Sequence, residues 1–237
     1  MPADPIALSS LEERIQLLRD ELSQALRWDR PSLLLAVHRS ELVRAQVEAQ
    51  LTVGLQVDPS PYIVDRTNAD IPLEIRGDPD RAHKFYLVRG LRWGGGGGHS
   101  NAYRALNMHR EFLVEDRVRL LLWLTPFEAR QLPRFAPDFW AFRHRYAEFL
   151  DLPEGGAQIL DGLAGLPRSA QALTRLAEAY LRLQCHEDAI RAYRQAARLG
   201  GDRRAGREAV AQVYQAMGRG EQARRLLRAA AGETRPG

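Results

Sequence analysis

Proteins commonly hold phosphate groups with glycine-rich loops and a lysine. Both kinds of residue stand out in this chain of 237 residues. Lys84 is the only lysine, and Phe85 follows it, so the sequence contains no Gly-Lys-Ser/Thr motif. Five consecutive glycines, Gly94 to Gly98, precede His99 and Ser100. A glycine-rich loop that enters a helix can bind an anion through its backbone N–H groups. Because this run lacks the spaced residues that fix such a turn, we expect a flexible loop in solvent.

Histidine and cysteine residues are too scattered to indicate a metal site or a nucleophile. No pair of the six histidines has the spacing of zinc ligands on a helix, and a single cysteine cannot anchor a structural zinc site. Cys185 and His186 are adjacent, so their side chains point apart and do not form a nucleophile with its base. We therefore predict no catalytic residue, no metal and no cofactor.

Positive charge is concentrated in the last third of the chain. Residues 160–237 contain 14 arginines and 8 acidic residues, a net charge of +6, whereas the whole chain carries +4. Such a region can attract nucleic acid or an acidic protein. Since the arginines alternate with acidic residues and glutamines, we interpret them mainly as a solvated helical surface.

The most informative regularity in the sequence is a repeat of 34 residues in the same region. Ala177, Tyr180, Ala189, Tyr193 and Ala196 of one stretch correspond to Ala211, Tyr214, Ala223, Leu227 and Ala230 of the next. A period of about 34 with small residues at fixed places is typical of stacked helix–turn–helix units. We expect helix pairs over 170–183 with 187–199 and over 204–217 with 221–231, after a helix over 157–165.

This pattern resembles the tetratricopeptide repeat family, although both units lack that family's early aromatic residue and its usual proline after the second helix. The resemblance covers residues 170–237 and implies a short helical solenoid with a concave groove that binds another protein. The groove residues that it implies are Gln171, Thr174, Glu178, Leu181, Arg182, Glu208, Gln212 and Gln215. Two units are fewer than usually stand alone. Their exposed faces are therefore expected to pack on the N-terminal part, on a second copy of the chain or on a partner.

Apolar segments in the first two thirds of the chain alternate with amphipathic ones. Short apolar runs predict strands at 32–37, 62–64, 85–88, 119–124 and 146–150. The expected helices cover 9–28, 41–55, 101–117 and 127–132, with a loop and at most a short helix over 66–84. Strands that alternate with helices indicate an α/β fold, an open and mostly parallel sheet with helices on both faces.

The order and spacing of these elements resemble the core of a P-loop ATPase of the AAA or STAND kind, without its nucleotide chemistry. In such folds a phosphate loop with glycines and a lysine follows the first strand. Here that strand runs into His38, Arg39 and Ser40, and the third strand is followed by Arg89 where magnesium-binding acids would stand. These two departures argue against hydrolysis. His38, Arg39, Ser40 and Arg89 are candidates for a ligand site at the edge of the sheet.

These observations predict two domains, an α/β domain over 1–153 and an all-α repeat domain over 154–237. We predict a non-enzymatic adaptor whose repeat domain recruits another protein. The alternative is a regulator that binds a nucleotide or nucleic acid at the sheet edge without hydrolysing it. The sequence has no apolar run of 18 residues, no visible signal peptide and one cysteine. We therefore expect no membrane partner and a cytoplasmic location.

Overall fold

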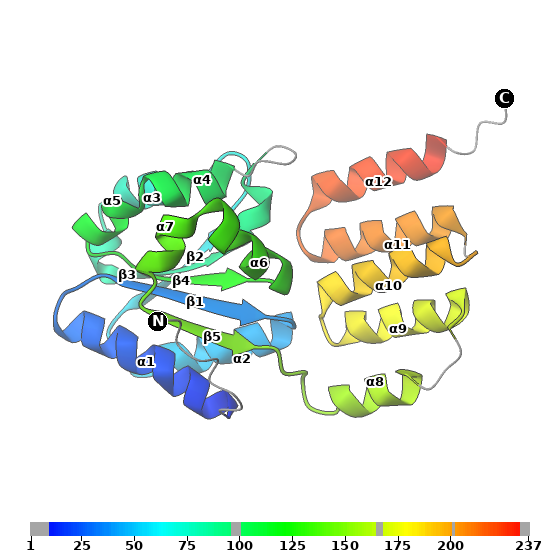
Figure 1. Ribbon diagram of the computed structural model, residues 1–237, viewed down its shortest axis with the longest axis horizontal. Coiled ribbons are helices and arrows are strands. Elements are labelled where there is room, and N and C mark those ends of the chain that lie inside the picture. The colour runs from blue at the N-terminus through cyan, green and yellow to red at the C-terminus, as the bar shows by residue number, and fades with distance from the viewer. Residues whose placement is uncertain (1–9, 96–100, 165–167, 201, 233–237) are drawn as a thin grey trace. The chain divides into compact units, whose positions relative to one another are not determined.

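The computed structural model describes residues 10–95, 101–164, 168–200 and 202–232. Its contacts divide the chain into two compact units (Figure 1). The first, Met1–His38 with Arg44–Leu150, contains a five-stranded sheet and is called the α/β unit. The second, Arg39–Val43 with Asp151–Gly237, is called the helical unit. The predicted fold class, α/β followed by a helical region, is confirmed. None of the helices in the described residues has the apolar length needed to cross a bilayer.

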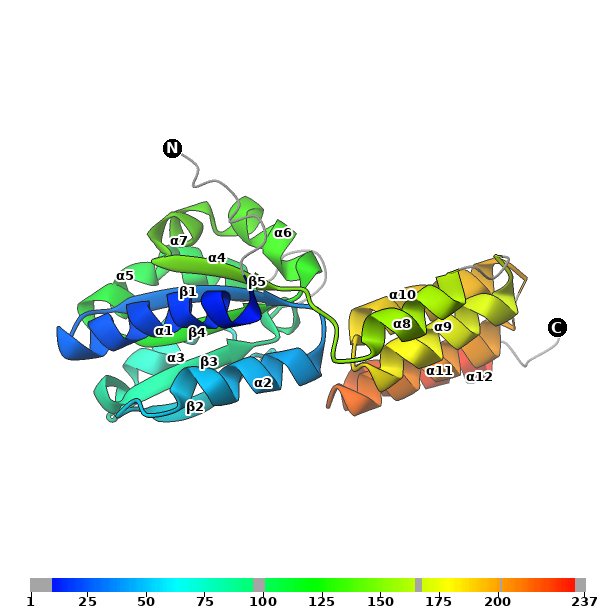
Figure 2. The same ribbon diagram turned by 90° about the horizontal axis from the view of Figure 1, so that it is seen from below.

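The α/β unit is built on a parallel sheet with the strand order β2-β3-β4-β1-β5, which Figure 2 shows side by side. The strands are β1 (Ser32–His38), β2 (Asp58–Ile63), β3 (Lys84–Arg89), β4 (Arg119–Leu124) and β5 (Arg145–Phe149). Every residue of the neighbouring strands β1 and β4 is buried. Their near-continuous leucine runs are what a strand covered on both faces requires.

Helices cover both faces of this sheet (Figure 1). They are α1 (Leu11–Arg27), α2 (Glu41–Thr52), α3 (Ile71–Arg76), α4 (Asn101–Met108), α5 (Arg110–Glu115), α6 (Pro126–Phe135) and α7 (Pro137–Phe142), with short 3-10 turns at Arg81–His83 and Leu91–Trp93. On one face, Leu35, Val88 and Leu122 belong to a buried cluster with apolar side chains of α3 to α7. The helices α1 and α2 lie on the opposite face (Figure 1).

The second strand is longer than the sequence predicted. The expected strand covered 62–64, whereas β2 begins at Asp58 and includes Pro59 and Pro61. Proline lacks a backbone N–H group and is therefore disfavoured inside a sheet. However, β2 is an edge strand that pairs only with β3, so a missing donor on its open side removes no ladder bond.

The predicted helix over 101–117 is two helices, α4 and α5, which meet at His109. Nδ1 of His109 lies 2.9 Å from a carboxylate oxygen of Asp70, which caps the start of α3. The His109 ring also stacks on Phe112. The break between α4 and α5 therefore lies where His109 contacts Asp70, which is distant in the sequence. Helical periodicity cannot predict such a contact.

The expectation of a solvent loop over Gly94–Gly98 is wrong for its first residue; Gly96 to Gly98 lie outside the described residues. Gly94 is buried, and its carbonyl accepts a hydrogen bond from the Ala102 N–H at 3.2 Å. A Cβ atom on Gly94 would lie 2.5 Å from Cβ of Ala102 and 2.7 Å from Cγ1 of Val64. Packing rather than backbone freedom thus requires glycine here, because its φ of −78° suits any residue.

We expect Gly94→Ala to lower the free energy of unfolding of the α/β unit by about 1–3 kcal/mol, because the added methyl group overpacks a closed site. Gly77→Ala is the matched control, since a Cβ atom there meets nothing closer than the Glu74 carbonyl oxygen at 3.4 Å. The control should change stability by less than about 0.5 kcal/mol in urea unfolding followed by circular dichroism. Equal stabilities for the two variants would contradict the packing role of Gly94.

Candidate protein-interaction site

The helical unit consists of helices that pack on one another in chain order (Figure 1). They are α8 (Gly156–Ala164), α9 (Ala170–Arg182), α10 (His186–Arg198), α11 (Arg203–Ala216) and α12 (Gly220–Gly232). The last four form two hairpins, α9 with α10 and α11 with α12. Ser169 and Asp202 begin α9 and α11 as N-caps, and their side chains accept one and two bonds, respectively, from backbone N–H groups of the first turn.

The period of 34 residues extends to the backbone of the two hairpin turns. Gln184 and Gly218, which are 34 positions apart, both adopt the left-handed conformation, with φ of 51° and 71°. The residue after each turn donates its N–H to the carbonyl of a tyrosine: Cys185 to Tyr180 at 2.8 Å, and Arg219 to the equivalent tyrosine at 2.7 Å. Such a bond satisfies a carbonyl at the helix end, as in other left-handed helix caps. The two turns therefore share one geometry.

Small residues occupy equivalent buried positions in both hairpins. The pairs are Ala177 with Ala211, Ala189 with Ala223, and Ala196 with Ala230, and none of these residues is more than 5% exposed. Alanine at a helix contact lets the two backbones approach, because a larger side chain would hold them apart. The alanines of the sequence repeat thus occupy the positions at which the helices pack closely.

The structure separates the eight predicted groove residues into two groups. Five of them, Gln171, Glu178, Arg182, Gln212 and Gln215, are exposed on α9 and α11. The other three make contacts inside the unit. The Thr174 hydroxyl donates to the Ala170 carbonyl at 3.0 Å, Leu181 packs on the buried cluster, and Glu208 pairs with Arg204 at 2.9 Å.

The four predicted ligand-edge residues also fall into two groups. His38 and Arg89 belong to the α/β unit, where His38 is 6% exposed and its ring meets Trp123 edge-on at 5.7 Å. The Arg89 carbonyl accepts the Val64 N–H at 2.9 Å. Arg39 and Ser40 belong instead to the helical unit.

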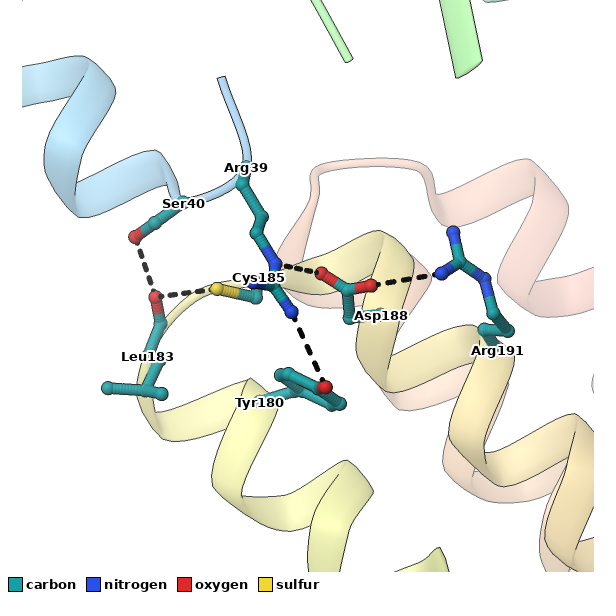
Figure 3. Close-up of polar contacts among 7 residues, drawn as sticks. All are labelled: Arg39, Ser40, Tyr180, Leu183, Cys185, Asp188 and Arg191. Carbon is teal, nitrogen blue, oxygen red and sulfur yellow. Dashed lines mark hydrogen bonds and ion pairs between the residues drawn. The ribbon is translucent and has the colours of Figure 1, made fainter. Parts of the chain in front are cut away.

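Arg39 and Ser40 form a polar cluster with the first hairpin (Figure 3). Nε of Arg39 donates to a carboxylate oxygen of Asp188 at 2.7 Å, and its guanidinium lies over the ring of Tyr180, 5.5 Å from the centroid. Ser40 is fully buried and donates its hydroxyl hydrogen to the Leu183 carbonyl at 2.7 Å. We call these five residues the Arg39 cluster.

The Arg39 cluster also uses the first backbone donors of α2. The Glu41 N–H donates to the Gln184 carbonyl at 3.2 Å, and the Leu42 N–H donates to Oγ of Ser40 at 3.2 Å. A helix N-terminus that follows the first strand of a parallel sheet is the usual place for a phosphate, because these N–H groups are otherwise unsatisfied. Here protein oxygen atoms satisfy both groups.

Cys185 lies in the turn beside this cluster and is fully buried, with its thiol donating to the Leu183 carbonyl at 3.6 Å. Burial raises the pKa of the Cys185 thiol from 9.0 to about 11. A nucleophilic cysteine needs the opposite shift. Within the described ranges, no three His, Cys, Asp or Glu side chains come together as metal ligands would.

A buried carboxylate near the carboxyl end of β4 was not identified from the sequence. Glu128 is 1% exposed and occupies the first turn of α6. One of its oxygens accepts the Arg92 N–H at 2.9 Å, and the other accepts the N–H and the hydroxyl of Thr125 at 2.9 and 3.0 Å. The Thr125 N–H bond and the bond from the Glu128 N–H to the Thr125 hydroxyl form a capping box, and the Arg92 bond ties the loop after β3 to the same carboxylate. The sequence signal was the spacing of Thr125 and Glu128.

Among its described residues, the helical unit has a pair of cavities that were not predicted from the sequence. One of about 440 Å³ is lined by apolar side chains of α8 and α9, by Leu199 after α10, and by polar side chains that include Arg198. The other, of about 430 Å³, is lined by four arginines, namely Arg194 and Arg198 of α10 with Arg203 and Arg207 of α11. None of the eight predicted groove residues lines either cavity. The arginines are spaced i, i+4 on each helix. The sequence alone favours a solvated surface for them over a site for nucleic acid or an acidic protein.

Comparisons with known proteins do not assign the chain to a family. No family model matches the sequence. No curated protein matches it either. Among solved structures, the ORC2 protein of Aeropyrum pernix in its ADP form aligns with 95% of this chain and 70% of its own, at 15% identity and a TM-score of 0.38. A similarity of this size establishes neither a family nor a ligand for this chain.

The two arginines on Asp188 allow a direct test of the Arg39 cluster. Arg39→Ala should destabilise the helical unit by about 1–2 kcal/mol, because it removes a charged hydrogen bond from a mostly buried carboxylate. Arg191→Ala is the control on the same carboxylate, since Arg191 is 61% exposed and should contribute less than about 0.5 kcal/mol. Chemical denaturation of both variants and of the pairs with Asp188→Ala measures the two coupling energies. Equal coupling for both arginines would show that burial does not matter here.

The Cys185 thiol gives a second, pH-dependent test. Because its pKa is raised in the folded state, the unfolded chain loses this proton first, and stability should fall as the pH rises from about 9 towards 11. Cys185→Ala should lose less stability between pH 8 and pH 10.5 than the wild type does, as measured by urea unfolding at each pH. A wild-type thiol that reacts with Ellman's reagent in the native protein as fast as in urea would contradict its burial.

Proposed function

We propose that this protein is a non-enzymatic adaptor whose helical unit, a pair of tetratricopeptide-like repeats, recruits another protein. The observation that carries the proposal is the equivalence of the two hairpins, in which alanines 34 positions apart share burial and the two turns share conformation and backbone bonds. Repeated helical hairpins stack into surfaces that bind other proteins. The exposed polar residues of α9 and α11, among them Arg182 and Gln212, supply hydrogen-bonding groups on that surface.

The bonding of the segment after β1 supports the proposal that this protein does not hydrolyse nucleotides. A phosphate-binding loop needs backbone N–H groups that are free to point at the ligand. The Glu41 and Leu42 N–H groups already donate to the Gln184 carbonyl and to Ser40. The third strand ends in Arg89, which repels rather than binds a magnesium ion.

A second candidate function is ligand binding at the sheet edge without hydrolysis. It is favoured by the parallel strand order, in which β4 lies between β1 and β3, as the resemblance to an AAA-type core implies. Ligands of open α/β sheets bind outside the carboxyl ends of the strands. Thermal unfolding with ATP, GTP or a short DNA separates the two functions. A nucleotide raises the melting temperature of the wild type only if that nucleotide binds the folded state.

For the adaptor, we expect Arg182→Glu to reduce recovery of the interacting protein by about tenfold in pull-downs with the full chain. Reversing a charge within an interface places like charges together, which costs up to several kcal/mol of binding free energy. Arg225→Glu is the matched control, because Arg225 is exposed on α12 and lies outside the predicted groove. Light scattering of the purified chain reports whether the interacting protein is a second copy. Unchanged recovery with Arg182→Glu would exclude this residue as an anchor of the groove.

A further inference from the structure

The arginine-lined cavity of the helical unit lies between α10, α11 and α12. It has a volume of about 430 Å³, which is within the range of small-ligand sites. Its lining combines the four arginines with the apolar side chains of Val210 and Leu226. Gly206 of α11 also lines it, and a Cβ atom there would lie 3.0 Å from Cβ of Ala197 on α10. The two helices therefore approach closely along this wall of the cavity.

Two of the four arginines are held by contacts with neighbouring helices. Nη2 of Arg194 lies 3.4 Å from the Tyr214 hydroxyl, and Nη1 of Arg207 donates to the Ala229 carbonyl at 3.1 Å. The bond of Arg194 occupies part of its guanidinium, which carries five N–H donors in all. Arg194 and Arg207 are therefore partly preorganised at the cavity.

The other two arginines have no acidic partner among the described residues. Arg198 and Arg203 form no ion pair there and are exposed. The nearest acids in the sequence are used elsewhere. Asp202 caps α11 through the N–H groups of Arg204 and Ala205, and Glu208 pairs with Arg204. Arg198 and Arg203 thus bring positive charge to the cavity that no acidic side chain among the described residues neutralises.

We propose that this cavity binds an acidic peptide segment of the recruited protein, with one apolar side chain on the Val210 and Leu226 wall and flanking carboxylates on the arginines. The inference rests on the proposed adaptor function and names the chemistry of its partner. Arginine is suited to this role because its planar fork binds a carboxylate through two parallel hydrogen bonds. A cavity lined by apolar side chains and by such donors matches an apolar residue between acids.

A nucleic acid fits the same charge less well. Proteins that bind single-stranded nucleic acid use aromatic side chains on which the bases stack, in addition to positive charge. The described residues that line this cavity are arginines, aliphatic residues and Gly206, with no aromatic ring among them. The apolar wall therefore favours a peptide side chain, and an oligonucleotide serves as the competing probe in the test.

The test measures fluorescence anisotropy of the full chain with a labelled peptide of sequence Gly-Asp-Glu-Leu-Asp-Glu-Gly. Arg198→Glu with Arg203→Glu should weaken its binding by at least about tenfold, as expected for losing two charged contacts. Replacing the peptide leucine by glycine should weaken binding about threefold or more through lost apolar burial. Oligothymidylate of ten nucleotides and inorganic phosphate are tested with the same proteins.

The matched control is Arg224→Glu with Arg228→Glu, which makes the same charge change at exposed positions of α12 outside the cavity. This control should bind the peptide within about threefold of the wild type, since remote surface charges are screened. Circular dichroism and thermal unfolding establish that each variant is folded.

Three outcomes would overturn the inference: equal losses in the two double variants, no effect of the peptide leucine, or tighter arginine-dependent binding of oligothymidylate. Absence of peptide binding at about 1 mM would overturn it as well. Any of these results leaves the adaptor function standing if Arg182→Glu still reduces recovery of the interacting protein. Loss of the Arg182 effect with cavity-dependent peptide binding intact would instead contradict the predicted groove.

Discussion

The backbone donors at the start of α2 constrain what the connection after β1 can do. A helix N-terminus leaves N–H groups that must find an acceptor, and a ligand anion is one common solution. In this protein the acceptors are the Gln184 carbonyl and the hydroxyl oxygen of Ser40. In the same segment, Arg39 donates a hydrogen bond to Asp188, and the Ser40 hydroxyl donates one to the Leu183 carbonyl. The segment 39–42 therefore has acceptors for its backbone N–H groups and also contributes side-chain hydrogen bonds to the helical unit.

The helical unit depends on the close packing of small residues, and this dependence explains why its architecture could be predicted from the sequence. The alanines of the two hairpins are buried at equivalent positions, and Gln184 and Gly218 turn the chain in the same way. Gly218 has the residue type that a left-handed cap favours. Gln184 does not, and its carbonyl accepts the bond from Glu41. Of the two turns, the one with the less favoured residue type is thus the one whose carbonyl accepts a bond from the start of α2.

Unlike the packing of the hairpins, the grouping of the arginines could not be predicted from the sequence. The excess of arginine after residue 160 is plain from composition, but composition does not say which arginines meet. Helix packing gathers Arg194 and Arg198 with Arg203 and Arg207 around one cavity, whereas Arg191 and Arg204 pair with acids on their own helices. An i, i+4 pair on a single helix can be predicted from spacing, because both residues lie on one face. The meeting of two such pairs depends on how two helices are rotated against each other.

The sequence by itself determined the alternation of strands and helices, the parallel character of the sheet and the two hairpins, because side-chain periodicity reports which face of an element is buried. It misjudged β2, whose prolines are tolerated only at a sheet edge, and Gly94, whose role is packing. Only the tertiary structure decided the strand order, the arginine-lined cavity and the acceptors for the α2 donors. The physical reason is that these features join distant residues, such as Ser40 and Leu183, which are 143 positions apart, and local pattern carries no information on such contacts.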